Sequence, residues 1–430
     1  MHPCRALLLM AVLVNSAPLF AASAAELPFG ILLANPSAVL ATAAAPLASE
    51  PTATPRDPEL GKTLVEPHLI RASRDDAAQH INRLQAEGGP YNPALAPVLT
   101  TEAGRALELG DTENALLLYQ QALYNLRVNG GLYAETQLPV LQSIMGLLRV
   151  SGDIDALDSR VDYYYRLMGS GLPPWNVAKI QAAIKTLSWR QEKLMPQLWT
   201  GREREVVDLV DEGERLVQSI CQAPAFAGVW CADITLQHLA TLYLIQFRVA
   251  PEVQSAMRRG YTAVPDRRTV TDGEWSPLQD RLQSILRGIK NKGADCINDA
   301  LPIAQDTQRL TVALADWHWF FGDTETAETM YKALYDSEPQ LFSQPVPLPA
   351  IPNLGRDPAL AEDSGTVNFV ASVSSRGTPE DISIIESGED DARWKNRGLR
   401  YFRSLRFRPA IDASGQFVAS PVELSLVVMR

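Results

Sequence analysis

The feature of this sequence that most constrains its fold is a helix–turn–helix pattern that recurs around Gly-Asp pairs. In the clearest copy, one helix ends near Leu109, Gly110-Asp111 form the turn, and a second helix follows. That helix carries apolar or small residues at i, i+1, i+4, i+7, i+8 and i+11 from Ala115, a spacing that places one buried stripe along a helix. Gly-Asp pairs recur at 152–153 and 322–323. We expect degenerate turns of the same array near Gly201, Pro251 and Gly293.

The repeated pattern predicts a mostly α fold in which an α-solenoid of helix pairs spans residues 65–340. One helix pair cannot bury its own apolar face, so successive pairs must stack. Residues 26–64 are rich in Ala, Pro and Thr and predict a flexible spacer. Residues 341–358 include Gln344-Pro345-Val346-Pro347-Leu348-Pro349. Because prolines at this density cannot continue a helix, we predict a linker there.

In residues 359–430 the spacing of apolar residues changes from a helical period to alternation. This change predicts a small α+β domain. Apolar side chains alternate from Val367 to Val373, and a second strand follows around Ile384. A helix is expected over residues 390–405. The last strand alternates again through Val422, Leu424, Leu426 and Val428. The predicted order is strand, strand, helix, strand.

The helical array resembles a known repeat family. The pattern G-D-x-x-x-A-L-x-x-Y-x-x-A-L, which runs from Gly110 to Leu123, resembles the second half of a tetratricopeptide repeat. The period is longer than in that family and the middle repeats match it poorly. The resemblance implies a curved stack whose concave surface binds a protein partner.

The C-terminal domain resembles the C-terminal domain of TonB. The matching positions lie in two turns and in the segment after the helix, and they are Arg376, Gly377, Phe407, Pro409, Ala410 and Gly415. Leu405 stands where the family often has Trp, and the Y-P-x-x-A segment before the first strand is missing. The resemblance implies that an edge strand adds an extended receptor peptide as a further strand. The expected edge is the last strand, with Val422, Leu424, Ser425, Leu426 and Val428.

The N-terminus predicts export. Arg5 precedes the apolar run from Ala6 to Val14, and Ala22-Ser23-Ala24-Ala25 supply the small residues of a cleavage site. This order is typical of a cleaved signal peptide over residues 1–25. The alternative is an uncleaved membrane anchor, because residues 6–25 carry no charge. We therefore expect a periplasmic protein, with membrane anchoring as the alternative.

Three cysteines follow the predicted signal: Cys221, Cys231 and Cys296. In an oxidising compartment two of them are expected to pair. Cys221 and Cys231 are nearest in sequence and flank a loop with Pro and Gly. They are the favoured disulfide.

The net charge and the absence of known motifs in the sequence limit the classes of function to be considered. The formal net charge of −11 disfavours nucleic acid as a partner. The four histidines after the signal are scattered, at 68, 80, 238 and 318. The sequence shows no catalytic motif, metal spacing or cofactor site, and it points to no small-molecule substrate.

The sequence therefore predicts a non-enzymatic adaptor that binds envelope proteins or peptides of outer-membrane receptors. The alternative is a TonB-type energy transducer for outer-membrane transport, held by an uncleaved N-terminal helix. A third hypothesis is a cell-wall enzyme whose carboxylates meet only in the fold. The oligomeric state stays open.

Overall fold

The computed structural model describes residues 67–194, 203–246, 272–348, 364–387 and 392–429. The predicted signal peptide at 1–25 and the spacer at 26–64 lie outside these ranges. Most of the described chain is helical, and a small domain of antiparallel strands with one short helix follows. This is the predicted fold class.

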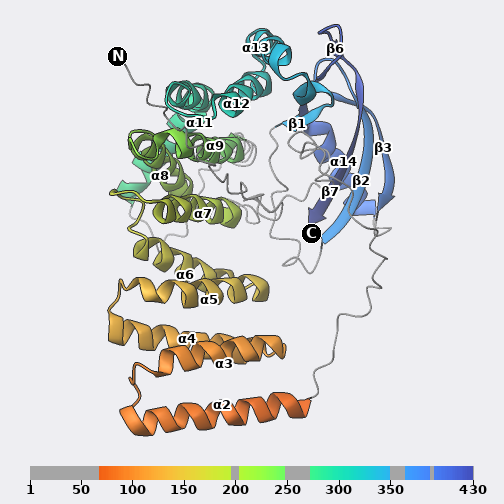
Figure 1. Cartoon of the computed structure of the whole chain (residues 1–430). Coiled ribbons are helices and arrows are strands. Elements are labelled where there is room, and N and C mark those ends of the chain that lie inside the picture. The colour runs from red at the N-terminus through yellow and green to blue at the C-terminus, as the bar shows by residue number, and fades with distance from the viewer. Residues whose placement is uncertain (1–66, 195–202, 247–271, 349–363, 388–391, 430) are drawn as a thin grey trace, which may run out of the picture.

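The helices stack in one column that starts at α2 and ends at α13, and the C-terminal strands lie beside its α12–α13 end (Figure 1). The helices of the column are α2 Pro67–Gly88, α3 Leu95–Glu108, α4 Thr112–Gly130, α5 Leu138–Ser151, α6 Ile154–Leu167, α7 Val177–Leu194, α8 Glu203–Cys221, α9 Ala227–Leu244, α11 Asp272–Ala300, α12 Thr307–Phe320 and α13 Thr324–Ser337. Single 3₁₀ turns, η1 Glu135–Gln137 and η3 Pro339–Phe342, precede α5 and follow α13.

The three Gly-Asp pairs form the same turn. Gly110, Gly152 and Gly322 have φ of 75°, 72° and 82°. At each turn the Asp N–H donates to the carbonyl five residues earlier, at 2.8, 3.2 and 2.9 Å. This is the 6→1 bond that ends a helix at a left-handed residue. One local motif therefore joins α3 to α4, α5 to α6, and α12 to α13.

The prediction of a turn near Gly293 is wrong. Gly293 lies inside α11, which continues to Ala300. A Cβ at this position would lie 2.2 Å from Cζ2 of Trp317 in α12. The glycine therefore permits close helix packing rather than a change of direction. The other two expected turns, at Gly201 and Pro251, lie outside the described residues.

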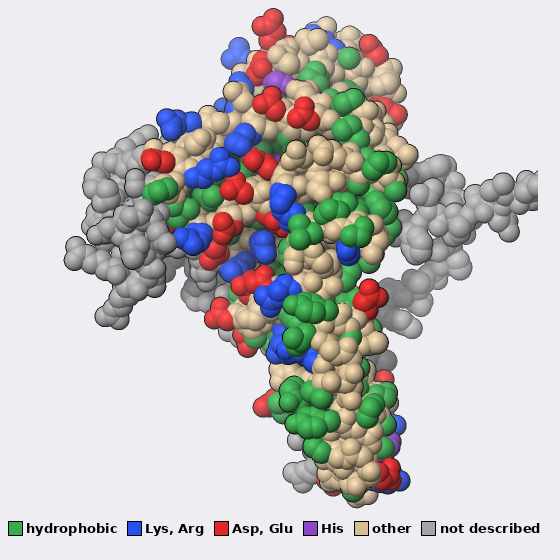
Figure 2. Space-filling model, turned by 90° about the vertical axis from the view of Figure 1, so that its left-hand side faces the viewer, with side chains coloured by type: hydrophobic (Ala, Val, Ile, Leu, Met, Phe, Trp, Pro, Cys, Tyr) green, Lys and Arg blue, Asp and Glu red, His purple; other side chains and the backbone are tan. Residues whose placement is uncertain are grey.

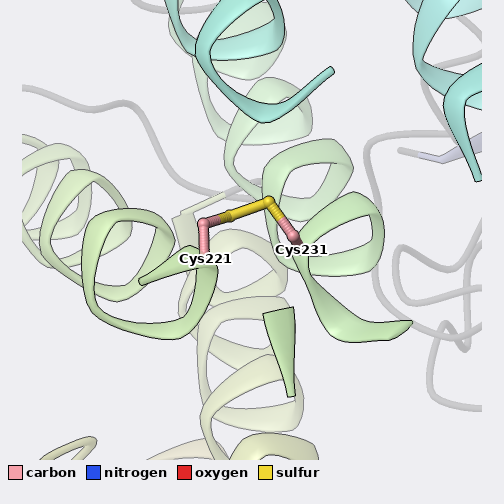
Figure 3. The surroundings of a disulfide bond; sticks show 2 residues. All are labelled: Cys221 and Cys231. Carbon is pink, nitrogen blue, oxygen red and sulfur yellow. A yellow bond between two sulfur atoms is a disulfide. The ribbon is translucent and has the colours of Figure 1, made fainter. Parts of the chain in front are cut away.

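A disulfide closes the α8–α9 hairpin (Figure 3). It joins Cys221, the last residue of α8, to Cys231 in α9, with an S–S distance of 1.98 Å and Cα atoms 4.8 Å apart. This is the pair favoured from the sequence, and it indicates an oxidising compartment. Cys296 is free, and burial raises the pKa of its thiol to about 12.

The C-terminal domain is built on a three-stranded antiparallel sheet. Its order is β3-β2-β7, with β2 Ser364–Val373 at the centre, β3 Pro379–Ser387 on one side and β7 Ser420–Met429 on the other. Helix α14, Ala392–Ser404, packs on one face, where Phe402 stacks on Phe369 with ring centres 5.0 Å apart. Short strands form two further pairs: β1 Val346–Leu348 with β4 Arg406–Arg408, and β5 Ala410–Ile411 with β6 Phe417–Val418.

Part of the predicted linker is structured. Within 341–358, Phe342 is fully buried at the end of η3, and Leu348 is buried in β1. Residues 349–358 lie outside the described residues. The stretch that follows α13 therefore continues directly into the contact between the helices and the C-terminal domain.

Candidate peptide-binding edge and its attachment to the helices

Strand β7 is one edge of the three-stranded sheet. It pairs with β2 along its whole length, from Ser420 opposite Val373 to Met429 opposite Ser364. On its other side, no strand of the described chain pairs with it. In the view of Figure 1, β7 is the strand of this sheet nearest to the helical column. The predicted last strand is thus a strand with one unpaired side among the described residues.

The side chains of β7 alternate between the two faces of the sheet. Leu424 is buried in the core beneath α14, and Val422 packs against the same core. Glu423 is exposed and Ser425 is half-buried. The other two predicted edge residues, Leu426 and Val428, stand opposite Val367 and Gly365 in the ladder, and their side chains lie outside the described part.

The direction of the β7 backbone groups follows from Pro421. Successive residues of an antiparallel strand direct N–H and C=O to opposite neighbours. Proline has no N–H and is tolerated in a sheet where that side of the backbone faces away from the partner strand. Pro421 pairs with Ser372 of β2, so its backbone groups are expected to face the free side.

A second, independent contact indicates the same direction for the backbone groups of β7. Ser383 Oγ of β3 donates to the carbonyl oxygen of Val370 at 3.4 Å, so that carbonyl points away from β7. Val370 stands opposite Glu423, and the backbone groups of Glu423 therefore also face away from β2. Odd-numbered residues of β7 present the free edge, while Val422, Leu424 and Leu426 bond to β2.

Two of the six motif residues meet at the base of the sheet. Phe407 N–H donates to the carbonyl of Gly377 at 2.8 Å. Gly377 has φ of 70°, and a Cβ there would lie 2.0 Å from the Phe407 carbonyl oxygen and 2.7 Å from Nε1 of Trp319 in α12. This glycine therefore lets the β2–β3 turn lie directly against the helical column.

The other four motif residues serve the fold or lie on the surface. Pro409 and Ala410 are buried, and Ala410 pairs with Val418. Gly415 forms a turn with φ of 77°. Hydrogen bonds from Ser414 and Gln416 lower the pKa of the Asp412 carboxyl in that turn. Arg376 is exposed.

A buried ion pair attaches the C-terminal domain to α12. Arg408 Nε donates to Asp316 Oδ1 at 2.8 Å, and Arg408 Nη2 donates to Asp316 Oδ2 at 2.7 Å. The Tyr331 hydroxyl of α13 donates to the same Asp316 Oδ1 at 2.7 Å. Burial alone would lower the pKa of the Arg408 guanidinium, but the Asp316 carboxylate outweighs it and the pKa is raised. Such a bidentate pair fixes geometry as well as charge.

Aromatic packing surrounds this ion pair. The Phe417 ring lies 6.1 Å from the Trp319 ring and 6.5 Å from the Tyr331 ring, and Phe342 lies 5.5 Å from Tyr331. The Tyr335 hydroxyl also donates to the Asp412 carbonyl at 2.8 Å. One hydrophobic cluster therefore includes residues of α12, α13, β1 and β5.

Sequence reasoning missed this junction. Its signal was a charge with an apolar residue on each side: Asp316 between Ala315 and Trp317, and Arg408 between Phe407 and Pro409. Buried charges are normally paired, so the two could have been proposed as partners.

His238 and His318 lie on different helices, α9 and α12. His318 Nδ1 is 3.0 Å from Asp323 Oδ2, and His238 is buried in α9 with its pKa lowered to about 4 by burial. Within the described ranges, no three His, Cys, Asp or Glu side chains gather in a way that could hold a metal ion. In those ranges, no helix has the length and apolar character that crossing a bilayer requires.

Family models and curated proteins were both compared with the chain. No family model matches the chain, and no curated protein matches it. The two family resemblances therefore rest on the quoted residues alone.

Proposed function

We propose that this chain is a periplasmic adaptor that binds two proteins without catalysing a reaction. Its TonB-like C-terminal domain binds an extended peptide of an envelope protein or outer-membrane receptor by strand addition at β7. Its helical column, which is tetratricopeptide-like, binds a second protein. The signal-like N-terminus and the Cys221–Cys231 disulfide support export.

The observation that carries this proposal is the side of β7 with which no strand of the described residues pairs. Unpaired N–H and C=O groups along an edge strand are a template for another chain. In strand addition these backbone groups supply affinity, and alternate side chains supply specificity. Pro421 and the charged Glu423 interrupt this edge, which is how natural sheets limit uncontrolled pairing.

The attachment to the helices supports the two-partner part of the proposal. Arg408, Asp316 and Gly377 hold the sheet against α12 in a defined orientation. A peptide on β7 and a protein on the helices would then be held at a fixed geometry. The three Gly-Asp turns, which share the same backbone hydrogen bond, support a repeat of helix pairs.

Ser425→Pro tests strand addition. Ser425 is four residues after Pro421, so its backbone groups also face the free edge of β7. Proline at this position removes an edge-facing N–H and keeps the bonds to β2. With extended peptides of outer-membrane receptors as probes, we expect affinity to fall about tenfold or more, because several edge contacts depend on this position. Ser425→Ala is the matched control and should bind as the unchanged chain does.

Two further results decide this test. Circular dichroism must show that Ser425→Pro keeps its fold, and Leu424→Pro, which breaks the β2 ladder, shows what sheet loss looks like. Unchanged binding by a folded Ser425→Pro chain contradicts the proposal. So does the absence of binding by every receptor peptide.

A further inference from the structure

The charges of the C-terminal domain are divided between its sheet and its helix. Strands β2, β3 and β7 contain no Lys, Arg or His, and their charged residues are all acidic: Glu380, Asp381, Glu386 and Glu423. Helix α14 contains no Asp or Glu, and its charged residues are all basic: Arg393, Lys395, Arg397, Arg400 and Arg403. On the helical column, in contrast, basic and acidic side chains lie intermixed (Figure 2). The sheet that offers the free edge therefore carries negative charge only.

Glu423 is the one charged residue of β7, and its backbone groups face the free edge. Its side chain is exposed and has no ion-pair or hydrogen-bond partner among the described residues. Its neighbours Val422 and Leu424 pack beneath α14, so the alternation of the strand directs Glu423 to the opposite face of the sheet. Glu380 of β3 lies on that same face, because its ladder partner Ser372 stands between two core residues of β2.

A strand added at β7 would direct its side chains alternately to the two faces of the sheet. Side chains on the α14 face would lie beside Val422 and Leu424, and near a helix whose charges are all positive. Side chains on the other face would lie beside Glu423, at the separation where opposite charges on neighbouring strands attract each other. Apolar residues therefore suit the first set of positions, and Lys or Arg suits the second.

From this division of charge, and on the basis of the strand addition proposed above, we infer that β7 selects an extended basic peptide in which Lys or Arg alternates with apolar residues. The net charge of −11 favours the same class of peptide, because it attracts basic peptides at long range and repels acidic ones. Glu423 then has two effects. It hinders pairing with an acidic or fully apolar strand, and it favours a basic one.

Two synthetic peptides as long as β7 test this preference. Each has Val at alternate positions and Thr between them, and two neighbouring Thr positions are Lys in one peptide and Glu in the other. We expect the exported chain to bind the Lys peptide about fivefold more tightly or better, because opposite charges across strands attract and like charges repel. Isothermal titration measures both Kd values. The difference should shrink as the salt concentration rises, since salt screens an exposed pair.

A charge reversal on the protein locates the source of the preference. Glu423→Lys should reverse the order of the two affinities, because it places a positive charge beside the added strand. Glu87→Lys is the matched control, since Glu87 is exposed near the end of α2, at the opposite end of the column from the sheet (Figure 1). It changes the net charge equally and should keep the preference for the Lys peptide. Circular dichroism checks that both variants keep the fold.

The outcomes separate this inference from the proposed function. Equal affinity for the two peptides overturns the selection of basic peptides and leaves strand addition standing, and so does a preference that survives Glu423→Lys. If the Lys peptide binds the Ser425→Pro chain as tightly as the unchanged chain, it binds elsewhere, and the inference also fails. If neither peptide binds, strand addition at β7 fails and the selection of basic peptides fails with it.

Discussion

Gly377 and Gly415 share a left-handed backbone but differ in their surroundings. Their φ angles are 70° and 77°. A Cβ at Gly377 would meet the Phe407 carbonyl oxygen at 2.0 Å, whereas a Cβ at Gly415 would have open space around it. The first glycine is required by packing and backbone together, and the second by the backbone alone.

We therefore expect the two alanine variants to separate these effects. Gly415→Ala should lower the free energy of unfolding by about 1 kcal/mol, the usual cost of a left-handed non-glycine residue. Gly377→Ala should lower it by more than about 2 kcal/mol, because the turn must also move away from Phe407 and Trp319. Urea denaturation measures both values, and equal losses would show that neither Phe407 nor Trp319 restricts this position.

His238 makes stability depend on pH. It is buried against Gly213 of α8, and burial lowers its pKa from 6.5 to about 4 in the folded chain. Glu214 raises this pKa and Lys292 lowers it, both less than burial does. Because the unfolded chain binds a proton at higher pH than the folded chain, the contribution is complete above pH 6.5. It is lost as the pH falls toward 4.

The expected loss between pH 6.5 and 4 is about 3 kcal/mol, from the spacing of the two pKa values. Denaturation at a series of pH values measures it. His238→Gln should flatten this part of the profile, since it removes the titrating group. A profile that is equally steep in that variant would assign the pH dependence to other groups.

At the scale of elements, the α8–α9 hairpin depends on its disulfide. Cys221 and Cys231 are ten residues apart in sequence. A bridge that closes so short a loop is expected to stabilise the chain by about 2–3 kcal/mol in the chain-entropy model. Reduction should lower the unfolding temperature, and a Cys221→Ser, Cys231→Ser chain should show no further change on reduction. An equal shift in that double variant would place the redox effect elsewhere.

The sequence predicted those elements whose signal is local. Each Gly-Asp turn carries its own left-handed glycine, and the alternation from Val367 to Val373 marks β2 without reference to other parts of the chain. Gly293 misled the prediction, because a glycine that permits close packing looks the same in sequence as one that ends a helix. The pairing of β1 with β4 escaped prediction since two three-residue strands have too little pattern of their own.

At the scale of the whole molecule, the C-terminal domain completes the end of the helical column. Asp316 and Arg408 are 92 residues apart in sequence, so no local pattern indicates their contact. Phe407 and Arg408 belong to the segment that resembles TonB, yet Arg408 binds α12. The ends of a repeat array need a cap, and here the sheet domain covers Trp319, Tyr331 and Phe342.

Removal of the C-terminal domain tests whether that domain caps the helical column. In the full chain, Asp316→Asn should cost about 3 kcal/mol, because Arg408 stays buried without its counter-charge. In a chain that ends after Leu348, the same change should cost less than about 0.5 kcal/mol, as at an ordinary surface position. Thermal denaturation followed by circular dichroism gives both values. An equal cost in the two chains would mean that Asp316 acts within the helices alone.

Residue-resolved amide hydrogen exchange of β7 in the free protein tests the central claim most directly. We predict fast exchange at Glu423, Ser425 and Val427, whose N–H groups face the unpaired side, and slow exchange at Val422, Leu424 and Leu426, which bond to β2. A bound receptor peptide should then slow the odd-numbered amides and leave the even-numbered ones as they were. Slow exchange at Glu423 and Ser425 before any peptide is added would contradict the account, because the edge would already be paired.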